Sequence, residues 1–387
     1  MSELTLVYAL EAPPLSYSKS IFLAGPTPRE AHVESWRPEA IKILDMLGYD
    51  GVVFIPEHRS GRWHGDWFAQ VYWEEHCLHL ADCIAFWVPR HMVTMPGLTT
   101  NVEWGVWQDS GKTVFGAPDS AQGVRYPEYY AGQYAVPTAR ELEVLLAQAM
   151  VKVGNGALRT GGEREVPLYI WNTASFQQWY AALKAAGNRL DHARLIWSFR
   201  VGPERNIVFC WALHVDVYIT AEDRHKTNEF VLSRPDISTV VMYQRAPVLE
   251  DSAIVLVREF RSPASNTDGY VYETPGGSSF KPGGNPLQLA SEEVFEETGF
   301  HLDSSRFQLH EARQLAATFS AHQAHLFSVE ITDDELAQLR AQEGTPYGVE
   351  ADTERTFVEV VTLKDILQQA NVDWSMLGMI MRVLTAT

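Results

Sequence analysis

Short apolar runs alternate with longer amphipathic segments through the first part of the chain, and this order predicts a parallel sheet covered by helices. The apolar runs typical of buried strands are residues 20–27, 51–56, 82–89 and 111–116. Segments with apolar residues at helical spacing separate them, at residues 35–47, 66–81 and 100–110. The sequence therefore predicts a doubly wound α/β fold, whose ligands lie beyond the carboxyl ends of the strands. Those ends are the loops after Gly25, Pro56 and Pro89.

The pattern then changes and predicts a second domain of mixed α+β type. A last amphipathic helix covers residues 137–153, and the polar, glycine-rich residues 154–165 follow it. Strand-like runs come next, at residues 208–213, 215–220 and 238–243. Helical patterns follow at residues 333–342, 363–370 and 375–385, and Ser375 is the expected N-cap of the last one. We expect a first domain at residues 1–152, a linker and extension at 153–194, and a second domain with a mixed sheet at 195–387.

The length and the net charge of the chain limit the classes of protein to which it can belong. A chain of 387 residues is long for a single core, so two domains are the natural expectation. The net charge of −18 argues against binding to nucleic acid or to a membrane surface, because both depend on Lys and Arg. No apolar run approaches the ~20 residues that span a bilayer, and the first residues lack the pattern of a secretion signal. With three widely spaced cysteines, Cys77, Cys83 and Cys210, we expect a cytoplasmic protein with reduced thiols.

A glycine-rich stretch containing Gly276 and Gly277 precedes a short helical segment with a dense group of carboxylates. Glu293, Glu296 and Glu297 lie on one face of this helix, where like charges repel. Mg²⁺ relieves such repulsion, since it takes oxygen ligands and is commonly shared between carboxylates and substrate phosphates. The pattern predicts an Mg²⁺ or Mn²⁺ site at these glutamates. A solvated acidic helix face is the alternative.

This segment resembles the Nudix box of the Nudix hydrolases. Residues 293–300 match the second half of the box, and the strand-like runs 254–261 and 270–277 are similar to its flanks in the ADP-sugar branch. The resemblance covers residues 195–387. It implies Mg²⁺-dependent hydrolysis of a nucleoside diphosphate-linked substrate, with Glu296 as a catalytic group. Substrate contacts are expected from Arg258, Arg261, Gly276 and Gly277, and Glu354 is a further candidate ligand.

Two positions depart from the Nudix box. Glu292 stands where the family has an arginine, and Gly284 stands where it has a glutamate. The family arginine orients a catalytic glutamate by a charge-assisted hydrogen bond, which a glutamate cannot do. The alternative is therefore a Nudix-like domain that binds a nucleotide without cleaving it and regulates the first domain as a sensor.

Three short motifs of the first domain resemble the nucleoside 2-deoxyribosyltransferase family and its N-ribosyl hydrolase relatives, at residues 22–26, 80–87 and 99–105. The resemblance covers residues 18–150. It implies cleavage of an N-glycosidic bond, with Glu103 as nucleophile at a helix start and Asp82 near the base or the nucleophile. A carboxylate stabilises the oxocarbenium-like state or traps the sugar, and a helix N-terminus keeps it ionised. A carboxyl with a raised pKa at Asp82 would protonate the leaving base. The alternatives are an ordinary first-turn glutamate and a turn-capping aspartate.

Further substrate contacts are expected in the first domain. Gly25 and Pro26 follow the first strand, a position suited to ribose or phosphate. Trp63 and Asp66 belong to an aromatic and polar patch that would stack a base, although core packing is the alternative for its neighbours Trp67 and Trp73. The expected partner is a nucleotide or an ADP-ribose-type small molecule. Members of the resembled family complete their pocket with residues from a neighbouring subunit or a chain terminus. We also expect a homo-oligomer.

Overall fold

The computed structural model divides the chain into two compact units, Met1–Phe230 and Val231–Thr387. It describes residues 4–30, 32–61, 66–278, 284–348, 354–368 and 372–386. Trp63, one of the predicted base-stacking residues, lies outside the described residues. Among the described residues, the structure has no helix that is long and apolar enough to cross a membrane.

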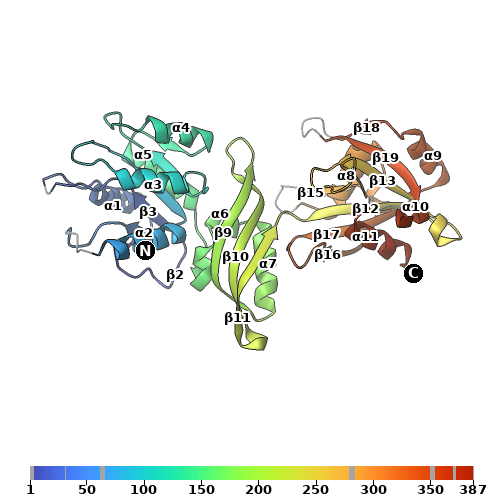
Figure 1. Cartoon of the computed structure of the whole chain (residues 1–387), viewed down its shortest axis with the longest axis horizontal. Coiled ribbons are helices and arrows are strands. Elements are labelled where there is room, and N and C mark those ends of the chain that lie inside the picture. Colours follow the sequence, from blue (N-terminus) through green and yellow to red (C-terminus); the bar gives the residue numbers. More distant parts are fainter. Residues whose placement is uncertain are drawn as a thin grey trace. The chain divides into compact units, whose positions relative to one another are not determined.

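The first unit contains a six-stranded sheet in the order β1-β4-β3-β5-β6-β7, and every neighbouring pair is parallel (Figure 1). Its strands are β1 (Thr5–Tyr8), β3 (Ser20–Ala24), β4 (Val52–Ile55), β5 (Cys83–Trp87), β6 (Thr113–Gly116) and β7 (Thr138–Ala139). The four central strands are buried along their whole length, which is why each reads as an unbroken apolar run. The predicted α/β fold of this region is confirmed.

Helices cover both faces of this sheet, and each face has its own apolar core. The helices are α1 (Arg37–Met46), α2 (Trp67–Leu80), α3 (Leu98–Trp107), α4 (Arg125–Gln133) and α5 (Leu142–Val153). On one face α1 and α5 bury Ile43, Leu44 and Leu145 against the sheet. On the other face α2, α3 and α4 contribute to a core that includes Trp73 and Trp104. The chain moves from β3 to β4 on one side and then to β5 on the other, so the direction of winding reverses at β3.

A separate antiparallel sheet of three strands follows, in the order β11-β10-β9. Its strands are β9 (Arg189–Val201), β10 (Ile207–Ile219) and β11 (Arg224–Ser233), and the accompanying helices are α6 (Leu168–Trp171) and α7 (Ala174–Ala185). The prediction of two strands at 208–213 and 215–220 within the second domain's mixed sheet is wrong. They form the single strand β10, because His214 between them is no turn former and pairs with Arg194 of β9. α7 covers this sheet through Phe176, whose ring contacts Trp211.

The second unit is built on an eight-stranded mixed sheet, and its main path is β16-β17-β12-β13-β19-β18. Its strands are β12 (Ile237–Gln244), β13 (Ala253–Phe260), β14 (Tyr270–Glu273), β15 (Gly276–Ser278), β16 (Gln308–Gln314), β17 (Gln323–Glu330), β18 (Pro346–Tyr347) and β19 (Thr356–Thr362). β12 is parallel to β17, whereas β13 is antiparallel to β19. The predicted mixed sheet is therefore present in this unit.

Helices lie on both faces of the mixed sheet as well. They are α8 (Pro286–Thr298), α9 (Asp333–Ala341), α10 (Leu363–Gln368) and α11 (Trp374–Leu384). α8 and α9 pack on one face through residues such as Val294 and Leu339, and α10 and α11 pack on the other through Ile366 and Ile380. The predicted N-cap at Ser375 is wrong: Asp373 caps α11, because its carboxylate accepts a hydrogen bond from the backbone N–H of Met376 at 2.7 Å.

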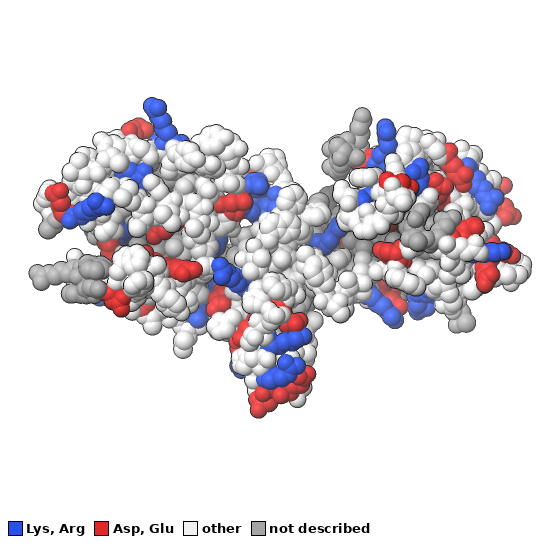
Figure 2. Space-filling model, viewed as in Figure 1, with Lys and Arg blue, Asp and Glu red and all other residues white. Residues whose placement is uncertain are grey.

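On the face drawn in Figure 2, lysine and arginine side chains are interspersed with aspartate and glutamate side chains. At the turn between β10 and β11, for example, Arg224 pairs with Glu222, and within β11 Lys226 pairs with Glu229. Charges of both signs are thus mixed on this face.

Candidate functional site

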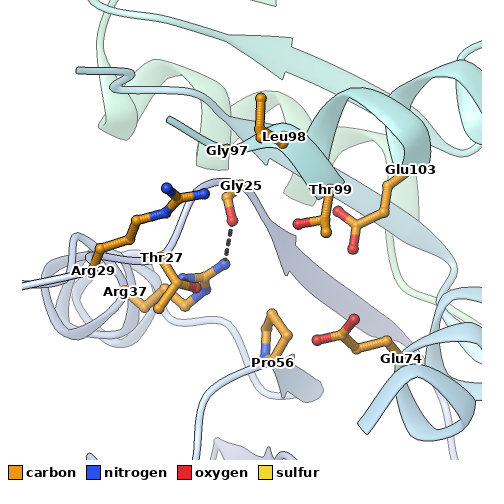
Figure 3. Close-up of a pocket in the computed structure, with 10 residues that line it drawn as sticks. All are labelled: Gly25, Thr27, Arg29, Arg37, Pro56, Glu74, Gly97, Leu98, Thr99 and Glu103. Atoms are coloured by element: carbon orange, nitrogen blue, oxygen red, sulfur yellow. Dashed lines mark hydrogen bonds between the residues drawn. The ribbon is translucent and has the colours of Figure 1, made fainter. Parts of the chain in front are cut away.

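A cavity of about 150 Å³ lies at the carboxyl ends of β3 and β4, beside the N-terminus of α3 (Figure 3). It is the place where the winding of the sheet reverses, which is where ligands bind in open α/β sheets. The residues that line it are Gly25, Thr27, Arg29, Arg37, Pro56, Glu74, Gly97, Leu98, Thr99 and Glu103. The structure therefore brings the predicted residues Gly25 and Glu103 to one cavity.

Gly25 is required at this position by the backbone itself. Its φ is +150°, and a Cβ atom built there would lie 2.1 Å from the carbonyl oxygen of Trp87. No larger residue fits without moving β5, so the chain leaves β3 tightly against its neighbour. This close approach keeps the floor of the cavity free of side chains.

Arg37 organises the polar side of the cavity although it is almost fully buried. Its guanidinium donates to the carbonyl oxygens of Leu23 and Gly25 at 3.1 and 2.7 Å, and to the Thr27 hydroxyl at 3.1 Å. It also pairs with Glu57 at 2.6 Å. These bonds fix the loop after β3 to α1 and give the cavity a buried positive charge.

Two carboxylates project into the cavity from the opposite side, Glu103 from α3 and Glu74 from α2 (Figure 3). Burial raises the pKa of Glu103 to about 7, and the Glu74 charge adds to this rise while Arg37 opposes it. Burial also raises the pKa of Glu74, against a hydrogen bond of 2.7 Å from Gln70 Nε2. Two half-buried acids with raised pKa values in a concave site are candidates for acid–base chemistry.

Glu103 lies in the second turn of α3, since the helix begins at Leu98 and Gly97 is its N-cap. The effect of the helix dipole falls off within the first turn. The expectation that the helix N-terminus keeps this carboxylate ionised is therefore wrong, because burial dominates and raises its pKa.

Asp82 lies away from this cavity, at the start of β5 and fully buried. Arg159 Nη2 donates to both of its carboxylate oxygens, at 2.7 and 2.6 Å, and the Ser20 hydroxyl donates to one of them at 3.1 Å. Arg159 belongs to β8 (Arg159–Thr160), which pairs with β2 (Ser16–Tyr17). The Asp82–Arg159 pair thus joins the first sheet to the segment after α5, and the structure does not bring Asp82 to Glu103.

Two other predicted residues have structural roles close to the cavity. Pro26 is buried against Gly97, and its carbonyl oxygen accepts a hydrogen bond from Trp36 Nε1 at 3.2 Å. Asp66 is exposed and caps α2 by accepting a hydrogen bond from the Ala69 N–H at 3.0 Å. Trp67 is exposed, and Trp73 packs in the core.

The second unit carries a different acidic site. Glu259 on β13, Glu297 on α8 and Glu354 before β19 have carboxylate oxygens that lie within 4.8 Å of one another. Burial and the neighbouring carboxylates hold the pKa of Glu297 well above its usual range. Glu259 Oε2 is buried and accepts no hydrogen bond among the described residues, although Arg261 Nη2 is 2.9 Å away. Crowded carboxylate oxygens fit a hard divalent cation.

The other predicted residues of this unit surround that cluster. Gly276 N–H donates to Glu297 at 2.9 Å, and Gly277 lies against the carboxylate of Glu293, where a Cβ atom would be 2.3 Å from Oε1. The pKa of Glu293 is raised to about 7, by burial first and then by Glu296 and Glu354. The side chain of Glu296 lies on the exposed side of α8.

The two predicted phosphate-contacting arginines are both engaged with acidic side chains. Arg258 pairs with Glu359 at 3.2 Å, and Arg261 pairs with Glu259 and Glu273, each at 2.9 Å. Glu292, which stands in place of the family arginine, accepts a hydrogen bond from Gln288 at 2.8 Å.

Residues 18–121 match the model of a family described as nucleoside 2-deoxyribosyltransferase like. The first unit therefore contains a nucleoside 2-deoxyribosyltransferase-like domain, and the cavity with Glu103 lies within it. Among curated proteins, none matches the chain.

Arg37, Glu74 and Glu259 were not predicted as site residues from the sequence. Glu74 had a usable signal, because it follows Gln70 by four residues on a helix whose buried positions are otherwise mostly apolar. The sequence contains no comparable signal for Arg37 or Glu259, since each joins its site only through contacts with residues distant in the sequence.

Proposed function

We propose that the first unit cleaves the N-glycosidic bond of a nucleoside or nucleotide, with Glu103 as the nucleophile and Glu74 as the proton donor. The observation that carries this proposal is the pair of half-buried carboxylates that line one cavity of a nucleoside 2-deoxyribosyltransferase-like domain. A pKa of about 7 leaves Glu103 partly ionised at neutral pH and more nucleophilic than an ordinary carboxylate.

The reaction balances with these two groups. A Glu103 carboxylate oxygen attacks the anomeric carbon as the N-glycosidic bond breaks, and the bonding electrons leave with the nitrogen of the base. Protonated Glu74 gives its proton to that nitrogen. A water or an acceptor nitrogen or hydroxyl then attacks the anomeric carbon, giving a proton back to Glu74 and releasing Glu103. Water gives hydrolysis, and a second base gives transfer.

The opposite side of the cavity suits the sugar end of the substrate. Arg29 and Arg37 supply positive charge there, and the first backbone N–H groups of α3 point away from the helix toward the same side. These groups would hold ribose hydroxyls or a 5′-phosphate. The substrate is then oriented with its base toward Glu74.

This proposal is tested by incubating the full-length protein with a panel of nucleosides and nucleoside monophosphates and measuring free base by mass spectrometry. We expect at least one substrate to release base, and Glu103→Gln to slow that release by roughly 1,000-fold. Glu39→Gln is the control, because Glu39 is exposed on α1 and pairs with Lys42. Release that is unaffected by Glu103→Gln would remove Glu103 from the reaction.

We propose a second activity for the second unit, the Mg²⁺- or Mn²⁺-dependent hydrolysis of a nucleoside diphosphate-linked substrate. The observation that favours it is the cluster of Glu259, Glu297 and Glu354. These residues would hold the cation, with Glu293 and Glu296 on the same helix as further groups. When bound, Mg²⁺ supplies polarisation of a diphosphate oxygen and a more acidic water. Glu293, whose pKa is raised to about 7 by burial and by Glu296 and Glu354, would be a proton acceptor among these carboxylates.

The second activity is tested with ADP-ribose, NAD and nucleoside triphosphates, each with Mg²⁺ or Mn²⁺, on the full-length protein and on Glu297→Gln. We expect one substrate to be hydrolysed by the wild type and not by the variant. If none is hydrolysed, yet one raises the melting temperature of the wild type only, the unit is a nucleotide sensor. Glu292 and Gly284 favour this sensor alternative.

A further inference from the structure

A second and larger space adjoins the cavity within the first unit. It is a groove of about 770 Å³ between the helices α2 and α3 on one side and the strand β9 on the other. Glu74, Thr99 and Glu103 line both the cavity and the groove. The two carboxylates therefore lie where the small polar cavity opens into the larger groove. A volume of this size is in the range that holds small organic ligands.

The groove walls carry exposed apolar side chains. On α3, Val102 and Val106 are each 68% exposed, and they are four residues apart on one helix face. The other exposed apolar residues of the lining are Trp67 and Val71 on α2 and Ile196 and Trp197 on β9. Single exposed apolar residues are ordinary, but a set that lines two opposed walls of one groove indicates a ligand site.

The wall made by β9 has a local irregularity at Ile196. Leu195 pairs with Leu213 and Trp197 pairs with Ala212, so Ile196 has no partner on β10 and forms a β-bulge. Bulges redirect a side chain out of the regular alternation of a strand. Ile196 is thus presented at the groove by a departure from regular pairing.

Hydrogen bonds hold this wall against α3. The Tyr169 hydroxyl donates to the carbonyl oxygen of Ser110 at 2.8 Å and lies 3.3 Å from the Ser198 hydroxyl. Arg200 Nη2 donates to the carbonyl oxygen of Asp109 at 2.8 Å. These contacts connect the strand residues just after Ile196 to the end of α3, so the width of the groove is fixed by the chain itself.

We propose that this groove binds the planar base of the substrate, and that β9, which lies outside the nucleoside 2-deoxyribosyltransferase-like domain, forms the second wall of the base site. This inference rests on the proposed N-glycosidic cleavage. Apolar and aromatic surfaces stack the faces of nucleobases. Besides Glu74 and Glu103, the groove lining contains Glu75, Asp109 and Glu165 against the cations Lys112 and Arg194, whereas Arg29 and Arg37 line the cavity. The excess of acidic side chains in the groove disfavours a phosphate there. The substrate therefore has one orientation, with its sugar or phosphate in the cavity and its base in the groove.

Free bases test the site without requiring any reaction. Adenine, hypoxanthine, cytosine, thymine and nicotinamide are each titrated into the full-length protein, and binding is followed by calorimetry and by saturation-transfer NMR. We expect at least one base to bind. Val106→Trp, which fills the groove from an exposed position, should weaken that binding at least 10-fold. Val151→Trp is the control, because Val151 is exposed on α5, outside the groove lining.

A second pair of variants tests β9 in particular. Ile196→Asp places a charge at the bulge and should weaken base binding at least 10-fold. Ile207→Asp places the same charge on β10, outside the groove lining, and should leave binding unchanged. Binding of a base that is equally strong in Ile196→Asp and in the wild type would overturn the assignment of β9 to the base site. Failure of every base to bind the wild type would overturn the proposal as a whole.

The outcomes separate this inference from the proposed cleavage. If bases bind in a groove-dependent manner and no substrate is cleaved, the base site stands and the glycosidic reaction fails. If base is released through Glu103 and KM is unchanged in Val106→Trp and Ile196→Asp, the reaction stands and the groove assignment fails. Sedimentation of the same variants tests whether a second copy of the chain occupies the groove instead of a base. If the wild type is a dimer and Val106→Trp or Ile196→Asp disrupts it, a second copy covers the groove. That result would also overturn the proposal.

Discussion

The two units differ in the charged residues that surround their acidic side chains. In the first unit Glu103 shares its cavity with one other acid, Glu74, and with the buried guanidinium of Arg37. In the second unit three carboxylates have oxygens within 4.8 Å of one another, and Glu293 lies close enough to add to the repulsion. Burial raises the pKa in both places, but only the second arrangement accumulates negative charge.

This difference teaches how one residue type serves two chemistries. A buried glutamate with one acidic neighbour and one cation nearby can act as a nucleophile without any added ion. Several glutamates on one site repel each other until a cation joins them. In the proposed functions, the number of crowded carboxylates therefore distinguishes the proposed covalent site from the proposed metal site.

The largest effect is expected from Gly25→Ala. A Cβ atom 2.1 Å from the Trp87 carbonyl, at a φ of +150°, should destabilise the first unit by about 3 kcal/mol or more, and its cavity should be lost. Gly48→Ala is the control, because Gly48 also has a positive φ but open space around it, so that about 1 kcal/mol is expected. Thermal unfolding of both variants measures the difference.

The same variant also tests the independence of the two sites. Because the two units have separate apolar cores, Gly25→Ala should leave the affinity of the second unit for Mn²⁺ unchanged. A loss of Mn²⁺ binding together with the first unit would contradict the division of the chain into two separately packed sites.

Removal of the proposed proton donor comes next. Glu74→Gln should slow base release by roughly 100-fold, because general acid catalysis contributes about 10²- to 10⁴-fold. The loss should be smallest for substrates whose base leaves without protonation. Glu39→Gln is the control, since Glu39 is exposed on α1 and lines neither the cavity nor the groove. Equal losses in the two variants would argue against a special role for Glu74.

A cation should stabilise the second unit and not the first. At 100 times its Kd, Mn²⁺ stabilises a folded protein by about 2.7 kcal/mol, which for a unit of this size raises the melting temperature by roughly 5–10 °C. Glu297→Gln and Glu259→Gln should reduce this shift, and Glu103→Gln should not. Calorimetry with and without chelator measures it, and a shift that persists in Glu297→Gln would place the cation elsewhere.

The smallest effect concerns the pH dependence of stability. Glu103 has a pKa of about 7 in the folded state against an ordinary value of 4.5, so the folded state binds more protons between these pH values. Stability therefore falls as pH rises from 4.5 to 7. Glu103→Gln should match the wild type at pH 5 and exceed it by about 1 kcal/mol at pH 8. Melting temperatures at the two pH values check the sign, and a variant less stable than wild type at pH 8 would contradict it.

Much of the fold of the first unit could be predicted from its sequence. β3, β4, β5 and β6 are buried on both faces, so each is an unbroken apolar run with a clear beginning and end. The helices between them carry apolar residues at a regular spacing. By contrast, the sequence predicted two strands where the structure has the single strand β10. The alternating pattern of β10 contains polar residues, and the sequence does not specify how far its pairing with a neighbouring strand extends.

The candidate sites were only partly predictable, for a related reason. Glu103 and the glutamates of α8 belong to local motifs, so their grouping is visible in the sequence. Arg37, Glu74 and Glu259 join these sites through tertiary contacts that no local pattern records. Asp82 is the opposite case. A local motif predicted it as a site residue, but in the fold its carboxylate forms an ion pair with Arg159, which is distant in the sequence.

The most direct test of the central claim is the capture of the glycosyl group on the protein. The full-length enzyme is mixed with a substrate that releases base, quenched in acid within the first turnover, digested and analysed by mass spectrometry. The account predicts a peptide that contains Glu103 with the added mass of the sugar, absent in Glu103→Gln. Rapid base release with the sugar attached to another residue, or with no attachment in any early quench, would contradict the assignment of Glu103 as the nucleophile.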